Sequence, residues 1–275
     1  MSLLHPHITR HQARATPPRA NLVAPTNRVA PVNRLLGARV DPLTMDETVK
    51  TIEDLIKKDS GHYNHLAMNA AKLVSASHDQ ELVDKFATAT VVTADGQSLV
   101  WASKLLGAPL PERVAGIDLM DRLVEASVEK GYRIYLLGAT DTVVRQVRWR
   151  FLARGANVVG WHNGFWRRED MTDQDMAGEI ARSNPDIVFV GVPSPLKEDF
   201  VFAHKDRTGA GICVGVGGSF DVVAGLTSRA PKFVQRMGME WFWRLAQEPR
   251  RMFKRYLVGN SKFVWLVVRA RLNRD

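Results

Sequence analysis

An acidic residue at the end of a short apolar run is the first candidate for chemistry. Thr93-Ala94-Asp95-Gly96-Gln97 closes a predicted strand and leads into a predicted helix. At the carboxyl end of a strand in a parallel sheet, a carboxylate faces the ligand crevice. There it can accept the proton of an attacking hydroxyl group. The same position also suits an aspartate that caps the helix. By position alone, Asp95 is either a general base or an N-cap.

A glycine-rich turn is the second candidate. Residues 215–221 include Gly217, Gly218 and Asp221 and lead into a predicted helix. Backbone N–H groups of such a turn and of a helix N-terminus bind phosphate. Phe220 breaks the G-x-G-x-x-G spacing and the chain has no Walker-type lysine, so the sequence predicts neither a dinucleotide site nor an ATP site. A tight structural turn explains the glycines equally well.

The sequence offers no convincing metal site. Asp173-Gln174-Asp175 resembles the D-x-D of metal-dependent sugar-nucleotide enzymes, but it follows Thr172 at the head of a predicted helix. Acidic residues in that position cap the helix and interact favourably with the positive end of the helix dipole. The eight histidines show no ligand spacing with Cys213 or within an H-E-x-x-H frame. We therefore predict no metal and no cofactor.

The net charge of +9 is carried by the two ends of the chain. Residues 1–40 hold six Lys and Arg and no acid, and residues 229–275 hold twelve against three acids. The region between them is acidic overall. Charge distributed in this way suits an anionic partner: nucleic acid, an acidic membrane surface or the phosphates of a substrate.

The C-terminal charge is interleaved with aromatic side chains. The cations are Arg244, Arg250, Arg251, Lys254 and Arg255, and the aromatic residues are Trp241, Trp243, Phe253 and Tyr256. Guanidinium groups pair with phosphates, and such amphipathic helices lie in the headgroup layer of membranes. An ordinary solvated face or a nucleic-acid patch are the alternatives, although no nucleic-acid motif accompanies the cluster.

The cellular location is predicted from the absence of membrane-spanning and secretory segments in the sequence. No run approaches the ~20 apolar residues that span a bilayer, and the first residues do not resemble a secretory signal. The single cysteine, Cys213, sits in an apolar run and suits a reducing compartment as a buried core residue. We expect a cytoplasmic protein that binds the inner face of the cell membrane peripherally.

These candidates need a scaffold, and the chain predicts an α/β fold. Short apolar runs alternate with helix-length segments, which indicates a mostly parallel sheet flanked by helices. The predicted strands are residues 65–68, 90–93, 133–137, 157–161, 186–191 and 211–215. A capping-box pattern at Thr44 and Glu47 opens a helix through Lys58. The residues that follow the strands, and so face the crevice, are Asn69, Asp95, Gly138, 193–198 and 217–221.

The ends of the chain differ from this core. Residues 1–34 are rich in Pro, Arg, Ala and Asn without a period, and we expect a disordered basic arm. Residues 35–229 form the predicted α/β core. Residues 230–275 form a predicted basic helical appendage with a break at Pro249.

Taken in order, seven segments resemble the WecG/TagA/CpsF glycosyltransferases, glycosyltransferase family 26, over residues 35–260. They are residues 93–96, 113–119, 136–138, Ser194-Pro195 with Glu198, 215–221, 229–231, and Glu240-Trp241 with Arg244-Leu245 and Glu248-Pro249.

The resemblance implies a Rossmann-like core with a C-terminal appendage and a metal-independent, inverting transfer. The donor is a UDP-sugar, the acceptor is a sugar on a polyprenyl diphosphate, and the product belongs to a cell-surface polysaccharide or exopolysaccharide. Asp95 becomes the general base on the acceptor hydroxyl. The substrate-binding residues that the resemblance implies are Asn69, Arg113, Asp118, Gly138, Lys197, Glu198, Gly217, Gly218, Asp221, Arg244, Arg250 and Arg251.

Two departures from the family pattern concern the donor sugar. Ala67 stands where many members have Thr, and Lys197 stands where Gln is common. A lysine there favours a different or an acidic sugar, so the donor sugars considered are N-acetylmannosamine, its uronic acid, glucose and glucuronic acid. Two other interpretations compete with the transferase: a nicotinamide-dependent oxidoreductase, and a non-enzymatic scaffold that binds membrane or nucleic acid. If the protein is a transferase, we expect no nucleic-acid partner.

Overall fold

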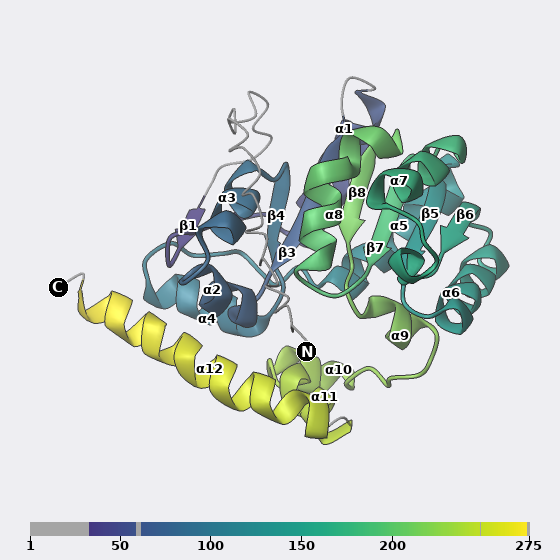
Figure 1. Cartoon of the computed structure of the whole chain (residues 1–275). Helices are drawn as coiled ribbons and strands as arrows, with labels where there is room; N and C mark the ends of the chain where they lie inside the picture. The colour runs from purple at the N-terminus through teal and green to yellow at the C-terminus, as the bar shows by residue number, and fades with distance from the viewer. Residues whose placement is uncertain (1–32, 59–61, 248, 274–275) are drawn as a thin grey trace, which may run out of the picture.

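A six-stranded parallel sheet forms the centre of the molecule (Figure 1). The computed structural model describes residues 33–58, 62–247 and 249–273. The sheet has the order β4-β3-β8-β7-β5-β6. Its strands are β3 (Tyr63–Met68), β4 (Val91–Ala94), β5 (Arg133–Gly138), β6 (Asn157–His162), β7 (Ile187–Gly191) and β8 (Ile212–Gly215). Each lies within two residues of a predicted strand, so the α/β fold class is confirmed.

Both faces of the sheet are buried because its strands are apolar on both sides. Ile187 and Phe189 of β7 belong to one core cluster, while Val188 and Val190 between them belong to another. This period of two sends alternate side chains to opposite faces. Continuous apolar strands of this kind require helices on both sides.

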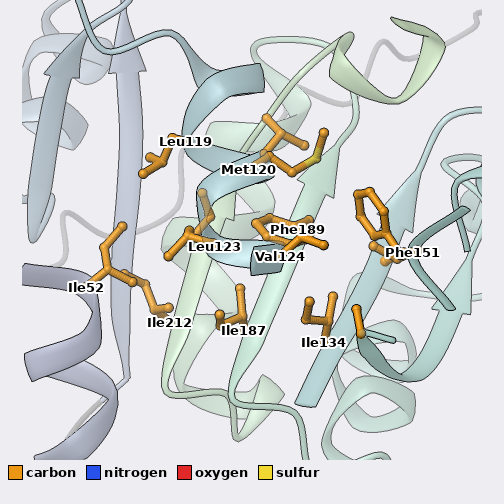
Figure 2. Packing of buried hydrophobic residues seen from close by; sticks show 14 of the residues in the cluster. Ile52, Leu119, Met120, Leu123, Val124, Ile134, Phe151, Ile187, Phe189 and Ile212 are labelled. Atoms are coloured by element: carbon orange, nitrogen blue, oxygen red, sulfur yellow. The ribbon is translucent and has the colours of Figure 1, made fainter. Parts of the chain in front are cut away.

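One face is covered by α1 (Met45–Lys57), α5 (Gly116–Lys130) and α6 (Asp141–Ala153). Figure 2 shows Leu123 and Val124 of α5 beside Phe189. Full burial of such a side chain stabilises the fold by about 1.5–3 kcal/mol. The capping box predicted for the first of these helices is confirmed, since Thr44 and Glu47 each accept a hydrogen bond from the backbone of the other. The start of α1 therefore follows from a local sequence pattern.

The opposite face is covered by α7 (Asp173–Arg182) and α8 (Leu196–His204), together with two short 3-10 segments, Trp166–Arg168 and Lys205–Thr208. Cys213 of β8 is buried in this layer, as the sequence predicted. Its thiol lies 3.7 Å from the Thr208 hydroxyl. The cysteine therefore serves as a core residue.

A hairpin that the sequence did not predict covers the edge strand β4. Strands β1 (Asn33–Leu35) and β2 (Ala38–Val40) pair with each other, and Asp41 follows them. The Asp41 N–H donates to the Val92 carbonyl at 2.7 Å, and the Val92 N–H donates to the Asp41 carboxylate at 2.8 Å. Burial raises the pKa of Asp41 even though Arg39 pairs with it. These contacts occupy backbone groups that an open edge would leave exposed.

The C-terminal part is helical and contains α10 (Lys232–Arg236), α11 (Glu240–Gln247) and α12 (Pro249–Leu272). Helix α11 ends at Gln247 and α12 begins at Pro249, where the sequence predicts a break. Phe263 and Val267 of α12 are buried in a cluster with residues of β3, β4, α2 (Ala70–Ala76), α3 (Gln80–Thr88) and α4 (Gln97–Leu105). Figure 1 shows α12 running along this end of the molecule. The C-terminal helices therefore pack onto the core.

A glycine at the end of β5 is dictated by backbone packing. Gly138 has φ of 140°, and a Cβ there would lie 2.5 Å from the Gly191 carbonyl carbon. Gly138 and Gly191 are register partners at the ends of β5 and β7. The two strand ends can approach this closely because Gly138 has no side chain, whereas the missing side chain of Gly191 makes room for the Phe220 ring.

We predict that Gly138→Ala lowers the free energy of unfolding by about 3 kcal/mol or more, because the new methyl group meets backbone and the φ is strained. Gly178→Ala in α7 is the matched control, since a Cβ there meets open space among the described residues. It should be neutral or stabilise by about 0.5–1 kcal/mol. Urea unfolding checks both, and equal stabilities of the two variants would contradict the packing argument.

Candidate active site

Asn69 and Asp95 lie side by side at the carboxyl edge of the sheet. Met68 of β3 is the register partner of Ala94 of β4, so Asn69 and Asp95 are the next residue on each strand. The Asp95 N–H donates to the Met68 carbonyl at 2.7 Å, which continues the ladder by one bond. Both residues are partly buried. The register therefore places these two residues next to each other at the carboxyl ends of β3 and β4.

Asp95 stands one residue before the N-cap of helix α4. Helix α4 begins at Gln97, and Gly96, with φ of 139°, occupies the N-cap position. Gly96 therefore provides the turn, and Asp95 precedes the cap.

Asn69 does cap its helix. Its Oδ1 accepts a hydrogen bond from the Lys72 N–H at 3.0 Å, and its backbone is extended. An asparagine in this position satisfies one of the N–H groups at the start of α2. This bond fixes the Asn69 side chain at the start of α2.

The start of α5 lies over the ends of β4 and β8. The Val114 N–H donates to the Ala94 carbonyl at 2.8 Å. A Cβ on Gly116 would lie 3.9 Å from the Gly215 carbonyl oxygen and from the Val216 Cα. The segment that carries Arg113 and Asp118 is therefore held at the same edge as Asp95.

Four charged side chains form an ion network at this edge. Arg113 pairs with Glu240 of α11 and lies 3.7 Å from the Asp118 carboxylate. Arg229 donates to the Asp118 carboxylate at 2.5 Å, and its Nε lies 3.9 Å from Glu240. We call Arg113, Asp118, Arg229 and Glu240 the edge network. It connects the core to the C-terminal helices.

Sequence reasoning did not select Arg229 or Glu240 as site residues. Both stand in segments that carry the family resemblance. Opposite charges distant in sequence pair only through the tertiary fold, so their contact left no local pattern. Their position in the segments that resemble the family was the one sequence feature that could have marked them as site residues.

A second, buried group of charges lies between α2, α8 and β8. Lys72 and Lys197 approach the Glu198 Oε1 at 3.1 and 3.4 Å, and the Ser194 hydroxyl donates to the same oxygen at 3.0 Å. We call Lys72, Lys197 and Glu198 the lysine cluster. The Lys197 and Glu198 side chains are only 5% and 1% exposed. Sequence reasoning found Lys197 and Glu198 but missed Lys72, which stands one helical turn beyond the strand end at Asn69.

The glycine turn after β8 adjoins the lysine cluster. Gly217 has φ of 54°, and a Cβ on it would lie 4.0 Å from the Lys197 Nζ. A Cβ on Gly218 would lie 3.9 Å from the Asp221 carboxylate. The predicted helix after the turn, α9 (Ser219–Val223), has only five residues. Any phosphate contact here would therefore come from the turn, because so short a helix has little dipole.

The predicted site residues do not all gather at one point. Gly138 lies at the β5 and β7 ends, where its packing role explains the glycine. The side chains of Arg244, Arg250 and Arg251 lie outside the described residues, although their helices are α11 and α12.

The D-x-D segment caps α7, as predicted. Thr172 is the N-cap and forms a capping box with Asp175, and Asp173 pairs with Arg167. The Arg167 hydrogen bond lowers the pKa of Asp173 despite partial burial. Among the described residues, no three His, Cys, Asp or Glu side chains gather in a way that could hold a metal ion.

His65 of β3 is a buried polar residue below the site. Its Nε2 lies 2.8 Å from the Thr93 hydroxyl, and its Nδ1 has no hydrogen-bond partner in the described structure. Burial, reinforced by the positive charges of Lys72 and Lys197, lowers the pKa of His65 to about 3. The imidazole is therefore neutral at physiological pH.

Comparison with known proteins places the chain among transferases of one family. The family described as "Glycosyl transferase WecG/TagA/CpsF family" matches residues 33–275. A protein of Staphylococcus aureus strain MW2, named N-acetylglucosaminyldiphosphoundecaprenol N-acetyl-beta-D-mannosaminyltransferase, is 29% identical over 79% of this chain and 85% of its own length. A protein of the same name from strain NCTC 8325 / PS 47 is 30% identical over 76% of this chain and 82% of its own length.

We predict that His65 makes the fold sensitive to mild acid. The unfolded chain takes up a proton on this histidine below pH 6.5 and the folded chain does so only near pH 3, so stability is lost as the pH falls through this window. His65→Gln cannot be protonated and keeps a hydrogen-bonding group for Thr93. Between pH 6.5 and 5 the wild type should lose about 2 kcal/mol more than His65→Gln.

Urea unfolding at the two pH values measures this difference. The exposed His78, changed to Gln, is the matched control and should retain the wild-type pH dependence. If His65→Gln and the wild type lose stability in parallel, His65 is not the residue that responds to acid.

Proposed function

The chain belongs to the WecG/TagA/CpsF family of glycosyl transferases, and we propose that it moves a hexose-type sugar from a UDP-sugar to a sugar carried on a polyprenyl diphosphate. The observation that carries this proposal is the placement of Asp95 beside Asn69 at the carboxyl edge, next to arginine and lysine groups. The names of the Staphylococcus aureus relatives support the acceptor, because both act on an N-acetylglucosaminyl diphosphoundecaprenol. The pathway would then be a cell-surface polysaccharide or exopolysaccharide.

In the proposed reaction, Asp95 accepts the proton of an acceptor hydroxyl. The hydroxyl oxygen forms a bond to the anomeric carbon of the donor sugar as the bond to UDP breaks on the opposite side, which inverts the configuration. The leaving group gains negative charge on its diphosphate. Cationic side chains and backbone N–H groups at the same edge are suited to stabilise that charge without a metal ion.

The remaining expected residues are proposed to surround the substrates. Gly217, Gly218 and Asp221 would adjoin the nucleotide, and Asn69 and Arg113 would contact sugar or phosphate. Asp118 and Glu198 are held by arginine and lysine, so we propose that they contribute by positioning those cations. Gly138 would border the cleft, and Arg244, Arg250 and Arg251 would close over the diphosphate. The donor candidates are N-acetylmannosamine, its uronic acid, glucose and glucuronic acid.

We further propose that the C-terminal helices bind an anionic membrane surface. Val264, Val268 and Leu272 repeat at four-residue intervals on α12 and are about half exposed or more, as is the adjacent Trp265. Phe233 and Phe242 on α10 and α11 are also exposed. Lys262, Arg269 and Arg271 accompany the apolar residues on α12, a composition that suits the interface of a bilayer.

The membrane association proposed here is peripheral. Within the described residues, no helix combines the length and the apolar character needed to cross a bilayer. The aromatic ring of Trp265 lies against Arg269, with the guanidinium 5.1 Å from the ring centroid. A tryptophan beside an arginine is well matched to the headgroup region, where apolar and ionic surroundings meet.

We predict that Asp95→Asn lowers the rate of transfer by about 10²–10⁴-fold, because the amide cannot accept the proton. The measurement is transfer from a panel of UDP-sugars to a short-chain polyprenyl-diphosphate-sugar acceptor, with EDTA present. Asp54→Asn, an exposed aspartate of α1, is the matched control and should keep the full rate. Full transfer activity in a folded Asp95→Asn protein would remove Asp95 as the base.

We also predict that replacing Trp265 and Val268 together with Ser reduces binding to anionic phospholipid vesicles at least several-fold, because two apolar side chains no longer enter the interface. Sedimentation with vesicles measures this binding. Trp149→Ser removes an exposed tryptophan of α6 and should leave binding unchanged. Equal vesicle binding by the double variant and by Trp149→Ser would contradict the docking of α12.

A further inference from the structure

The lysine cluster holds more positive than negative charge. Two ammonium groups, from Lys72 and Lys197, share the single carboxylate of Glu198, and both approach the same oxygen, Oε1. The other oxygen, Oε2, is buried and has no hydrogen-bond partner in the part of the chain that is described. Lys72 has a further bond to the Ala67 carbonyl at 2.5 Å and lies 5.6 Å from the centre of the Phe86 ring. Lys197 is thus the less well compensated of the two lysines.

The buried Lys197 side chain packs against the end of β8. A Cβ on Gly215 would lie 3.0 Å from both Cδ and Cε of Lys197, so this glycine makes room for the lysine side chain. A Cβ on Gly217, the next glycine of the turn, would lie 4.0 Å from the Lys197 Nζ. Gly217 is partly exposed and Gly218 is exposed, so the turn itself is accessible. The ammonium group is therefore directed to the carboxyl edge, at the turn where the nucleotide is proposed to bind.

Burying the Lys197 ammonium group costs free energy, because it shares its only carboxylate partner with Lys72. Removing a charge from water is unfavourable unless an opposite charge compensates it. Burial and then the charge of Lys72 lower the pKa of Lys197 to about 8, while Glu198 acts in the opposite direction. Burial alone would raise the pKa of Glu198, but the two lysines hold it below its ordinary value. The carboxylate is thus already ionised and offers no second negative charge.

We propose that Lys197 is the anion-binding residue of this cleft and that the missing negative charge is an anionic oxygen of the bound donor, placed at the Gly217 turn. This inference rests on the proposed function and adds to it the chemical feature of the donor that the cleft recognises. The oxygen belongs to the donor diphosphate or to the carboxylate of a uronic acid. Both supply the same compensation, so the experiment distinguishes them.

The test compares the binding of UDP, UDP-glucose and UDP-glucuronic acid to wild type, Lys197→Met and Lys197→Gln, by calorimetry. Met keeps the unbranched side chain that packs on Gly215, and Gln provides a second, neutral polar variant. A charge-assisted hydrogen bond is worth roughly 10- to 100-fold in affinity, so a loss of this size is expected. Lys130→Gln, an exposed lysine of α5 at the opposite edge of the sheet, is the matched control and should bind as the wild type does.

A loss for all three ligands assigns the oxygen to the diphosphate. A loss confined to UDP-glucuronic acid assigns it to the sugar carboxylate. Unchanged affinity of both Lys197 variants for every ligand that the wild type binds overturns the inference and leaves the proposed function intact. Failure of the wild type to bind any of the three removes the UDP donor and, with it, this inference.

The unfolding temperature without ligand separates this role from a structural one. If Lys197 completes an ion pair that holds the fold, Lys197→Met should unfold at a clearly lower temperature. If it awaits an anion, its removal leaves Lys72 and Glu198 as a balanced pair, and the unfolding temperature should be unchanged or higher. A lower unfolding temperature together with unchanged ligand affinity would assign the residue to the fold.

Discussion

The sheet is apolar on both faces, and this constraint determines where chemistry can occur. Strands such as β7 bury alternate side chains under α5 on one side and under α7 and α8 on the other. Polar groups inside these layers carry a desolvation cost, as the low pKa of His65 shows. Charged side chains therefore collect where the strands end. Asp95, the edge network and the lysine cluster lie at one set of these ends, the carboxyl edge.

The two groups of charged side chains at that edge differ in net charge. The edge network pairs two arginines with two carboxylates, so its charges compensate one another and its contacts hold the C-terminal helices to α5. The lysine cluster has two ammonium groups for one carboxylate, and it is more deeply buried. A network whose charges cancel is suited to hold the structure together. A cluster with excess positive charge is stabilised most when an anion binds.

The sequence was sufficient to predict the layers but not the contacts between distant segments. The strands were found because each is a short apolar run between helix-length segments, and α1 because Thr44 and Glu47 form a local capping pattern. The β1–β2 hairpin was missed because its strands have only three residues each, too few to show a period. Asp95 and Asn69 were found because they follow strands. Lys72 and Glu240 acquire their partners only through folding, so composition and spacing could not reveal them.

The C-terminal helices connect the exposed apolar face to the candidate site. Glu240 fixes α11 to Arg113 at the start of α5, and Phe263 and Val267 of α12 are buried in the cluster that includes Leu73 of α2. Helix α2 begins directly after Asn69, and the segment with Arg113 is bonded to the last residue of β4 before Asp95. A bilayer bound to the exposed side of α12 would therefore be linked through packed contacts to both strand ends. Under the proposed function, the same helices would then set the orientation of Asp95 relative to a lipid-linked acceptor.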